Sequence, residues 1–142
     1  MLSSLVPDLL VLDSWPIMEW LKEREPATAK FYILLDAAQS GATQFFMSRI
    51  NYGEVIYSIR KAPDIVRRDE ALRRFLIAPI RIVSVEDALV DEAANLKSSF
   101  NFYDADAFAA ALAIRRNVSL VTGDQEFLPG TSVRLRLYWL GA

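Results

Sequence analysis

Four acidic side chains, Asp13, Glu54, Asp106 and Asp124, stand where they could act together. Asp13 directly follows a short apolar run, Asp106 opens a long apolar run, and Asp124 comes just after a third. A cluster of carboxylates repels itself and raises its own pKa values, so a divalent cation is its natural neutraliser. Carboxylate oxygens suit Mg²⁺ or Mn²⁺. Such a site could activate water and stabilise the charge of a phosphate undergoing displacement.

The composition narrows this chemistry further. The 142 residues include no histidine and no cysteine, which excludes Ser-His-Asp triads, zinc sites of the H-E-x-x-H kind, thiolate metal sites and cysteine nucleophiles. A formal net charge of -2 excludes a protein that grips nucleic acid by bulk positive charge, although it does not exclude an RNA substrate. No run approaches the ~20 apolar residues that cross a bilayer. We therefore expect one cytoplasmic domain over residues 1–142, without a membrane segment.

The stretch from residue 104 to residue 124 organises the rest of the chain. Residues 107–114 are apolar on every side, which predicts a buried helix. Arg115 and Arg116 suit the negative end of that helix, and Asn117 can adopt the left-handed conformation that ends it. Residues 118–121 then predict an interior parallel strand that delivers polar side chains at its carboxyl end, the edge where open α/β sheets bind ligands.

The amino-terminal half predicts two further strands with helices between them. A buried strand at residues 9–12 ends at Asp13, a helix starts near Ser14, and a second helix covers residues 27–38. A strand at residues 43–47 and a helix at residues 49–60 follow. In that helix we predict that Ile50, Glu54 and Tyr57 share an apolar face. A carboxylate on such a face needs a partner, for which Arg49 is one alternative.

The carboxyl-terminal half continues the alternation. It predicts a helix at residues 64–76 with four side chains in the core, Ile65, Leu72, Phe75 and Leu76. A strand at residues 80–83 precedes a capping box at residues 84–87 and a helix to about Lys97. Residues 133–140 alternate apolar and polar side chains, as in a half-exposed edge strand. Alternating strands and helices predict an α/β fold with a mainly parallel sheet and helices on both faces.

Four segments taken together resemble a known family. VLDS contains Asp13, SRINYGEV contains Asn51 and Glu54, DADAFAAALA contains Asp106, and LVTGD contains Asp124. This set is similar to the PIN domain family, and most closely to the VapC-type toxins of bacterial toxin–antitoxin pairs. The resemblance covers nearly the whole chain. It implies a three-layer α/β/α sandwich and an endoribonuclease that depends on Mg²⁺ or Mn²⁺, cleaves RNA, is inhibited by a cognate antitoxin protein and forms a homodimer.

The same resemblance implies a role for individual residues. The catalytic pocket would consist of Asp13, Glu54, Asp106 and Asp124, with Asp13, Asp106 and Asp124 as the metal ligands. Frequent polar neighbours of this pocket are matched by Ser14, Asn51 and Thr122. Asp104 departs from the commonest toxin pattern. Because two positions along a helix point apart, Asp104 and Asp106 cannot both face one metal, and we assign Asp106 to the pocket and Asp104 to a cap or rim; the opposite assignment stays open.

Two other functions stay open from the sequence. Phosphoryl transfer on Asp13, as in haloacid-dehalogenase-like phosphatases or response-regulator receivers, lacks the second acid of D-x-D and a strand-end lysine. A PIN-like module that only binds a partner would need none of the acids, yet all four are present. Each acid also has a structural alternative: Asp13 and Asp124 as turn or capping residues, Glu54 in a salt bridge, and Asp106 as an acid at a helix start.

Overall fold

Five parallel strands form the centre of the protein in the computed structural model, which describes residues 6–132 and 134–142. The strands are β1 (Leu9–Leu12), β2 (Gln44–Ser48), β3 (Ile80–Val83), β4 (Ser119–Thr122) and β5 (Leu137–Trp139). The connecting helices are α1 (Ser14–Leu21), α2 (Ala27–Gln39), α3 (Arg49–Arg60), α4 (Ile65–Ile77), α5 (Asp87–Phe100), α6 (Asp104–Arg116) and the 3-10 helix η2 (Gln125–Ser132). The predicted alternation of strands and helices is confirmed. Within the described residues, no helix is long and apolar enough to span a bilayer.

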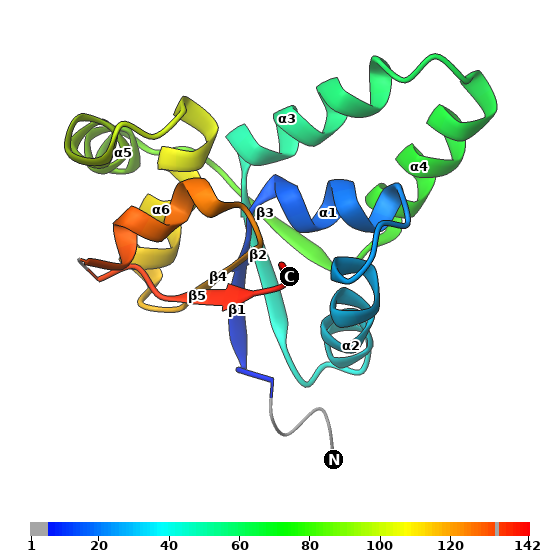
Figure 1. Ribbon diagram of the computed structural model, residues 1–142, viewed down its shortest axis with the longest axis horizontal. Helices are drawn as coiled ribbons and strands as arrows, with labels where there is room; N and C mark the ends of the chain where they lie inside the picture. Colours follow the sequence, from blue (N-terminus) through cyan, green and yellow to red (C-terminus); the bar gives the residue numbers. More distant parts are fainter. Residues whose placement is uncertain (1–5, 133) are drawn as a thin grey trace.

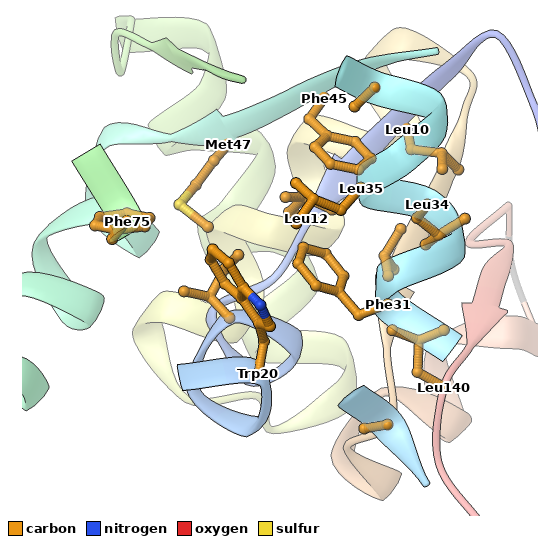
Figure 2. Packing of buried hydrophobic residues seen from close by; sticks show 14 of the residues in the cluster. Leu10, Leu12, Trp20, Phe31, Leu34, Leu35, Phe45, Met47, Phe75 and Leu140 are labelled. Atoms are coloured by element: carbon orange, nitrogen blue, oxygen red, sulfur yellow. The ribbon is translucent and has the colours of Figure 1, made fainter. Parts of the chain in front are cut away.

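Helices cover both faces of the sheet, so the fold is a three-layer α/β/α sandwich. Side chains of successive strand residues point to opposite faces; accordingly Leu10 and Leu12 of β1 belong to one core and Val11 to the other. The first core lies under α1 to α4, where the Phe31 ring packs between Trp20 and Phe45 (Figure 2). The second lies under α5 and α6, on the opposite side of the sheet in Figure 1. The predicted fold class is confirmed.

The strand order places a crevice beside β1. The order is β3-β2-β1-β4-β5, so the chain moves from β1 toward β2 and β3 on one side and later returns to β4 and β5 on the other. Leu12 of β1 is paired in parallel with Val121 of β4. Ligands bind outside the carboxyl ends of strands where connections diverge in this way. Asp13 follows β1 at this point, and residues 122–124 lie at the same point at the end of β4.

Helix α6 lies in the core as predicted and begins two residues earlier than Asp106. Its buried side chains are small over most of its length, from Ala107 to Ala113. Small side chains let the helix backbone approach the sheet closely, so this helix can be apolar all round without crowding. It ends at Asn117, whose φ of 55° and ψ of 45° are left-handed. The predicted helix end is confirmed.

The predicted apolar face of α3 is wrong. Asn51, Val55 and Ile59 are buried, whereas Ile50 and Tyr57 are exposed. The buried residues are spaced four apart and therefore form one stripe along the helix. Their stripe packs against the first core, which turns Ile50 and Tyr57 outward. Residue types alone could not distinguish these two faces, because each contains apolar side chains.

The predicted core face of α4 is largely wrong as well. Only Phe75 is fully buried; Leu72 is half-buried, while Ile65 and Leu76 are exposed. The helix lies at the periphery of the molecule, beyond α1 and α3 (Figure 1). A peripheral helix covers the core with a narrow stripe only, here anchored by Phe75 stacked on Tyr52 at 5.7 Å between ring centroids. Four other apolar side chains of α4 are left on the surface: Ile65, Val66, Leu76 and Ile77.

The capping box predicted at residues 84–87 is not formed. Helix α5 begins at Asp87, and Glu86 occupies the N-cap position without a side-chain capping hydrogen bond. Ser84 therefore stands before the helix, where its hydroxyl cannot cap the first turn. The strand β3 ends at Val83, and the chain needs residues 84–86 as a connection before the helix can start.

The last strand is shorter than predicted. Of the residues 133–140, Val133 lies outside the described residues, and only Leu137–Trp139 form β5. Strand β4 has only four residues, and pairing runs from Leu120 opposite Leu137 to Thr122 opposite Trp139. The backbone of Arg136 and Leu140 still bonds to β4, at 2.9 Å each, through the Leu120 N–H and the Thr122 carbonyl oxygen, but the short partner strand supports no longer pairing. The preceding 3-10 helix η2 was not predicted.

Candidate active site

Asp13 lies at the bottom of the crevice and is 1% exposed. Its backbone N–H donates to the Val121 carbonyl oxygen at 3.3 Å, and the Thr122 hydroxyl donates to its Oδ2 at 3.0 Å. Its Oδ1 is buried and has no hydrogen-bond partner among the described residues. Burial, reinforced by the charges of Asp106 and Glu54, raises the pKa of Asp13 to about 8, although the Thr122 hydrogen bond opposes the shift.

Asp106 lies in the first turn of α6 and is 7% exposed. Burial raises its pKa to about 7, and the charges of Asp124, Glu54 and Glu126 add to the shift. The positive end of the α6 dipole favours an acid at this position, but it does not outweigh the crowding of like charges. Two of the predicted acids therefore hold protons near neutral pH unless a cation joins them.

Glu54 has a hydrogen-bond partner that the sequence did not name. The Ser14 hydroxyl donates a hydrogen bond to Glu54 Oε1, which joins the start of α1 to α3. Arg49 is not paired with Glu54; its guanidinium lies 4.3 Å from the centre of the Tyr52 ring. The alternative of a salt bridge between Glu54 and Arg49 is thus wrong, and Ser14 is the partner that the sequence left unnamed.

Asp124 is held by the turn that follows β4. Its backbone N–H donates to the Thr122 hydroxyl oxygen at 3.1 Å, and its Oδ1 accepts from the Glu126 N–H at 3.0 Å. The preceding Gly123 allows this turn, because a Cβ there would lie 2.3 Å from the Trp15 ring and 2.8 Å from the Gly141 nitrogen. Asp124 is therefore both a turn residue and a cavity residue, and the structural alternative coexists with its place in the site.

Asn51 is buried and connects α3 to α6 without lining the cavity. Its N–H donates to the Ser48 hydroxyl at 3.1 Å, and that hydroxyl donates to Asn51 Oδ1 at 2.6 Å. Asn51 Nδ2 donates to the Ala105 carbonyl oxygen at 3.1 Å. Since Ala105 directly precedes Asp106, Asn51 positions the turn that carries this acid.

Asp104 lies outside the cavity. Its side chain is exposed and forms an ion pair with Lys97 of α5. Asp106, two positions further along the same helix, points into the cavity instead. Asp106 therefore lines the cavity, whereas Asp104 lines a neighbouring surface depression. This is the arrangement expected if Asp106 and not Asp104 belongs to the pocket.

One cavity of about 440 Å³ brings the four predicted acids together with Ser14. Sequence reasoning missed the other side chains that line it: Trp15, Met18, Glu19, Arg24, Ser58 and Tyr103. A signal was present for three of these, because Trp15, Met18 and Glu19 share one face of the helix that begins at Ser14. Nothing in the sequence marked Arg24, Tyr103 or the nearby Glu126, since they come from connecting segments.

The donor set of this cavity fits a hard divalent cation in type. It offers five carboxylates together with the hydroxyl oxygens of Ser14, Ser58 and Tyr103, and the unpaired Oδ1 of Asp13 is an atom whose burial a cation would compensate. Within residues 6–132 and 134–142, no group of three acidic side chains is already arranged to hold a metal ion. These two observations are compatible, because Mg²⁺ keeps several waters and is usually bound through one or two carboxylates rather than by a complete protein cage.

Comparison with solved structures shows the same fold in several proteins. VapBC2 from Rickettsia felis matches with a TM-score of 0.70 and 18% identity, over 91% of this chain and 96% of that chain. VapBC-5 from Mycobacterium tuberculosis matches with a TM-score of 0.67 and 18% identity, over 94% of this chain and 99% of that chain. VapC20 from the same organism matches with a TM-score of 0.64 and 14% identity, over 89% of this chain and 98% of that chain.

Comparison by sequence supplies the family. No curated protein matches the chain. Residues 10–128 match the family described as PIN domain. This segment spans β1 to η2 and contains all four acids of the cavity. The chain therefore belongs to the PIN domain family.

Proposed function

We propose that this protein is an endoribonuclease that depends on Mg²⁺ or Mn²⁺ and hydrolyses RNA phosphodiester bonds. The observation that supports this most strongly is the cavity itself, where Asp13, Glu54, Asp106 and Asp124 meet at the diverging strands. Burial, reinforced by the neighbouring like charges, raises the pKa values of Asp13 and Asp106, so the site favours a cation. The likeness to VapC20, described as a sarcin–ricin loop cleaving toxin, supports RNA as the substrate.

Some cavity residues would hold a metal ion, and others would orient the attacking water. Asp13, Asp106 and Asp124 would hold the cation, directly or through its waters, and the cation would lower the pKa of water and stabilise charge on the phosphate. Thr122 orients Asp13 through Oδ2 and leaves Oδ1 directed to a ligand. Ser14 holds Glu54 through Oε1, so Glu54 Oε2 is the atom that would accept a proton from the attacking water. Hydrolysis would then add the water oxygen to phosphorus while one ester P–O bond breaks, and the leaving oxygen would take up a proton from solvent.

We further propose that a cognate antitoxin protein inhibits this activity. Similar structures include VapBC complexes and one described as a toxin-antitoxin complex from Klebsiella pneumoniae. A second cavity, of about 430 Å³, lies between α1, α3 and α4, and Met18 and Ser58 line both this cavity and the carboxylate cavity. Its apolar lining suits the side chains of an amphipathic segment, and a basic residue at the end of that segment would meet the acids.

The partner assembly has its own test. Co-expression with a neighbouring small open reading frame should yield a complex in which RNA cleavage is suppressed. A stable complex with unchanged cleavage would contradict inhibition. Homodimerisation stays a prediction from the family resemblance, and light scattering of the purified protein would measure it.

The experiment that tests the nuclease is cleavage of a mixed RNA pool by purified, antitoxin-free protein. Reactions contain EDTA, Mg²⁺ or Mn²⁺, and compare wild type with Asp13→Asn and Asp106→Asn. Asp104→Asn is a matched control, because Asp104 belongs to the same turn of α6 but lies outside the cavity. We expect metal-dependent cutting that both cavity variants lose and the control keeps. Cutting that is equal in wild type and Asp13→Asn would contradict the proposal.

A further inference from the structure

The carboxylate cavity has an unbalanced charge. Among the described residues that line it, five are acidic and only Arg24 is basic; the acids are Asp13, Glu19, Glu54, Asp106 and Asp124. A phosphodiester chain is itself anionic and is repelled by such a lining. A cation held by these acids would act at the reacting phosphate. The phosphates on either side of it need a separate positive group.

Arg24 has a fixed backbone and a loosely held side chain. Its N–H donates to the Glu19 carbonyl oxygen at 2.9 Å, and its own carbonyl accepts from the Thr28 N–H at 3.0 Å and the Thr28 hydroxyl at 2.6 Å. Its side chain is 61% exposed, and Nη1 lies 3.8 Å from Glu19 Oε1. At this distance the pair makes no true hydrogen bond, and exposed pairs of this kind contribute little. The guanidinium can therefore exchange Glu19 for another anion.

We propose that Arg24 binds a phosphate of the RNA chain next to the one being cleaved. This inference rests on the proposed ribonuclease function and adds a substrate-positioning contact to it. A guanidinium presents paired N–H donors that match two phosphate oxygens. Glu19 holds the side chain at the cavity rim while no RNA is bound, and the phosphate replaces it.

The test measures binding without cleavage. Anisotropy of a fluorescent single-stranded RNA is recorded in EDTA at several KCl concentrations, for wild type, Arg24→Gln and Arg24→Lys. Arg115→Gln is the matched control, because Arg115 also pairs with a glutamate on the surface, at 2.9 Å from Glu92, but does not line the carboxylate cavity. Melting temperatures verify that each variant is folded.

We expect Arg24→Gln to weaken binding about tenfold, as for loss of one charge-assisted contact. The slope of log K against log salt should fall by about the value for one phosphate, ~0.7 for a single strand. Arg24→Lys should keep most of the slope, because the charge remains, and lose part of the affinity, because the paired donors are gone. Arg115→Gln should bind as wild type does. In cleavage assays Arg24→Gln should raise KM with little change in kcat.

The outcomes separate this inference from the function on which it rests. Equal affinity and equal salt slope for wild type and Arg24→Gln would overturn the role of Arg24, even if wild type cleaves RNA. Binding that depends on Arg24, with no cleavage under Mg²⁺ or Mn²⁺, would contradict the nuclease and leave the phosphate contact standing. A wild-type protein that binds no RNA in EDTA at any salt concentration would overturn the contact with Arg24, and only a lack of cleavage under Mg²⁺ or Mn²⁺ as well would overturn the nuclease.

Discussion

Asn51 Nδ2 donates a hydrogen bond of 3.1 Å to the carbonyl oxygen of Ala105, and this contact ties the start of α3 to the first turn of α6. The two helices lie 54 residues apart in sequence at these positions. Asp106 is the next residue after Ala105, so its place in the cavity depends on a side chain that does not itself line the cavity. A polar residue with no contact to substrate can therefore govern the site.

Asn51→Ala should both destabilise the protein and impair cleavage. The change removes the bond to Ala105 and leaves the buried Ser48 hydroxyl without its acceptor, at a cost of about 1–3 kcal/mol. Asn95→Ala, at an exposed helix position, should stay within about 0.5 kcal/mol of wild type. Chemical denaturation and RNA cleavage measure the two effects. Full activity of a stably folded Asn51→Ala protein would show that Asn51 does not position Asp106.

The stability of the metal-free protein should fall as pH rises from about 4 to about 8. Burial and like charges raise the pKa values of Asp13 and Asp106 from the ordinary carboxyl value of 3.8 to about 8 and about 7, so the folded state binds more protons than the unfolded state in this window. Each such proton contributes a slope of about 1.4 kcal/mol per pH unit. Thermal melts in EDTA across this range measure it, and Asp13→Asn should flatten the profile. A rise in stability with pH would refute the raised pKa values.

The stabilisation of the protein by a bound metal ion should increase with pH, whereas the stability of the metal-free protein decreases. A cation needs the ionised carboxylates, so the stabilisation by Mg²⁺ or Mn²⁺ should grow as Asp13 and Asp106 lose their protons toward pH 8. Melting temperature with and without metal measures the shift. Asp13→Asn should reduce it, whereas Asp104→Asn should leave it unchanged. A metal effect that survives Asp13→Asn intact would place the cation elsewhere, and no effect in wild type would favour a module that only binds a partner.

Thr122→Val should raise the pKa of Asp13 further and shift the pH dependence of cleavage upward. The hydroxyl donates to Asp13 Oδ2 and stabilises the ionised carboxylate, so its removal favours the protonated form. The same change removes the acceptor of the Asp124 N–H, which adds about 1–2 kcal/mol of destabilisation. Thr122→Ser keeps the hydroxyl and should retain the wild-type pH profile. Identical profiles for Val and Ser at this position would refute the role of the hydroxyl.

Gly123→Ala and Gly53→Ala should change the free energy of unfolding in opposite directions. A Cβ on Gly123 would lie 2.3 Å from the Trp15 ring and 2.8 Å from a backbone nitrogen, so we expect a loss of about 1–3 kcal/mol. A Cβ on Gly53, inside α3, would meet nothing within 4 Å, and alanine there should stabilise the helix by about 0.4–1 kcal/mol. Denaturation midpoints of the two variants measure both changes in stability. A neutral Gly123→Ala variant would mean that the turn before Asp124 can move.

The sequence by itself determined the elements that are buried on all sides. Strand β1, the buried part of α6 and the end of that helix at Asn117 agree with prediction, because an interior strand or helix needs apolar side chains throughout and leaves little ambiguity. The alternation of strands and helices then restricts the sheet to parallel order, and the carboxyl ends of such strands collect Asp13 and Asp124 at one edge.

Only the tertiary structure decided what surrounds these acids. Helices α3 and α4 have apolar side chains on more than one face, so their orientation depended on which stripe met the core, and the predictions for Ile50, Tyr57, Ile65 and Leu76 were wrong for this reason. The partner of Glu54 is Ser14, and Asn51 reaches Ala105, because the strand order brings α1, α3 and α6 to one crevice. Arg24 and Tyr103 join the cavity from connecting segments. Contacts between residues tens of positions apart depend on packing, which local periodicity does not contain.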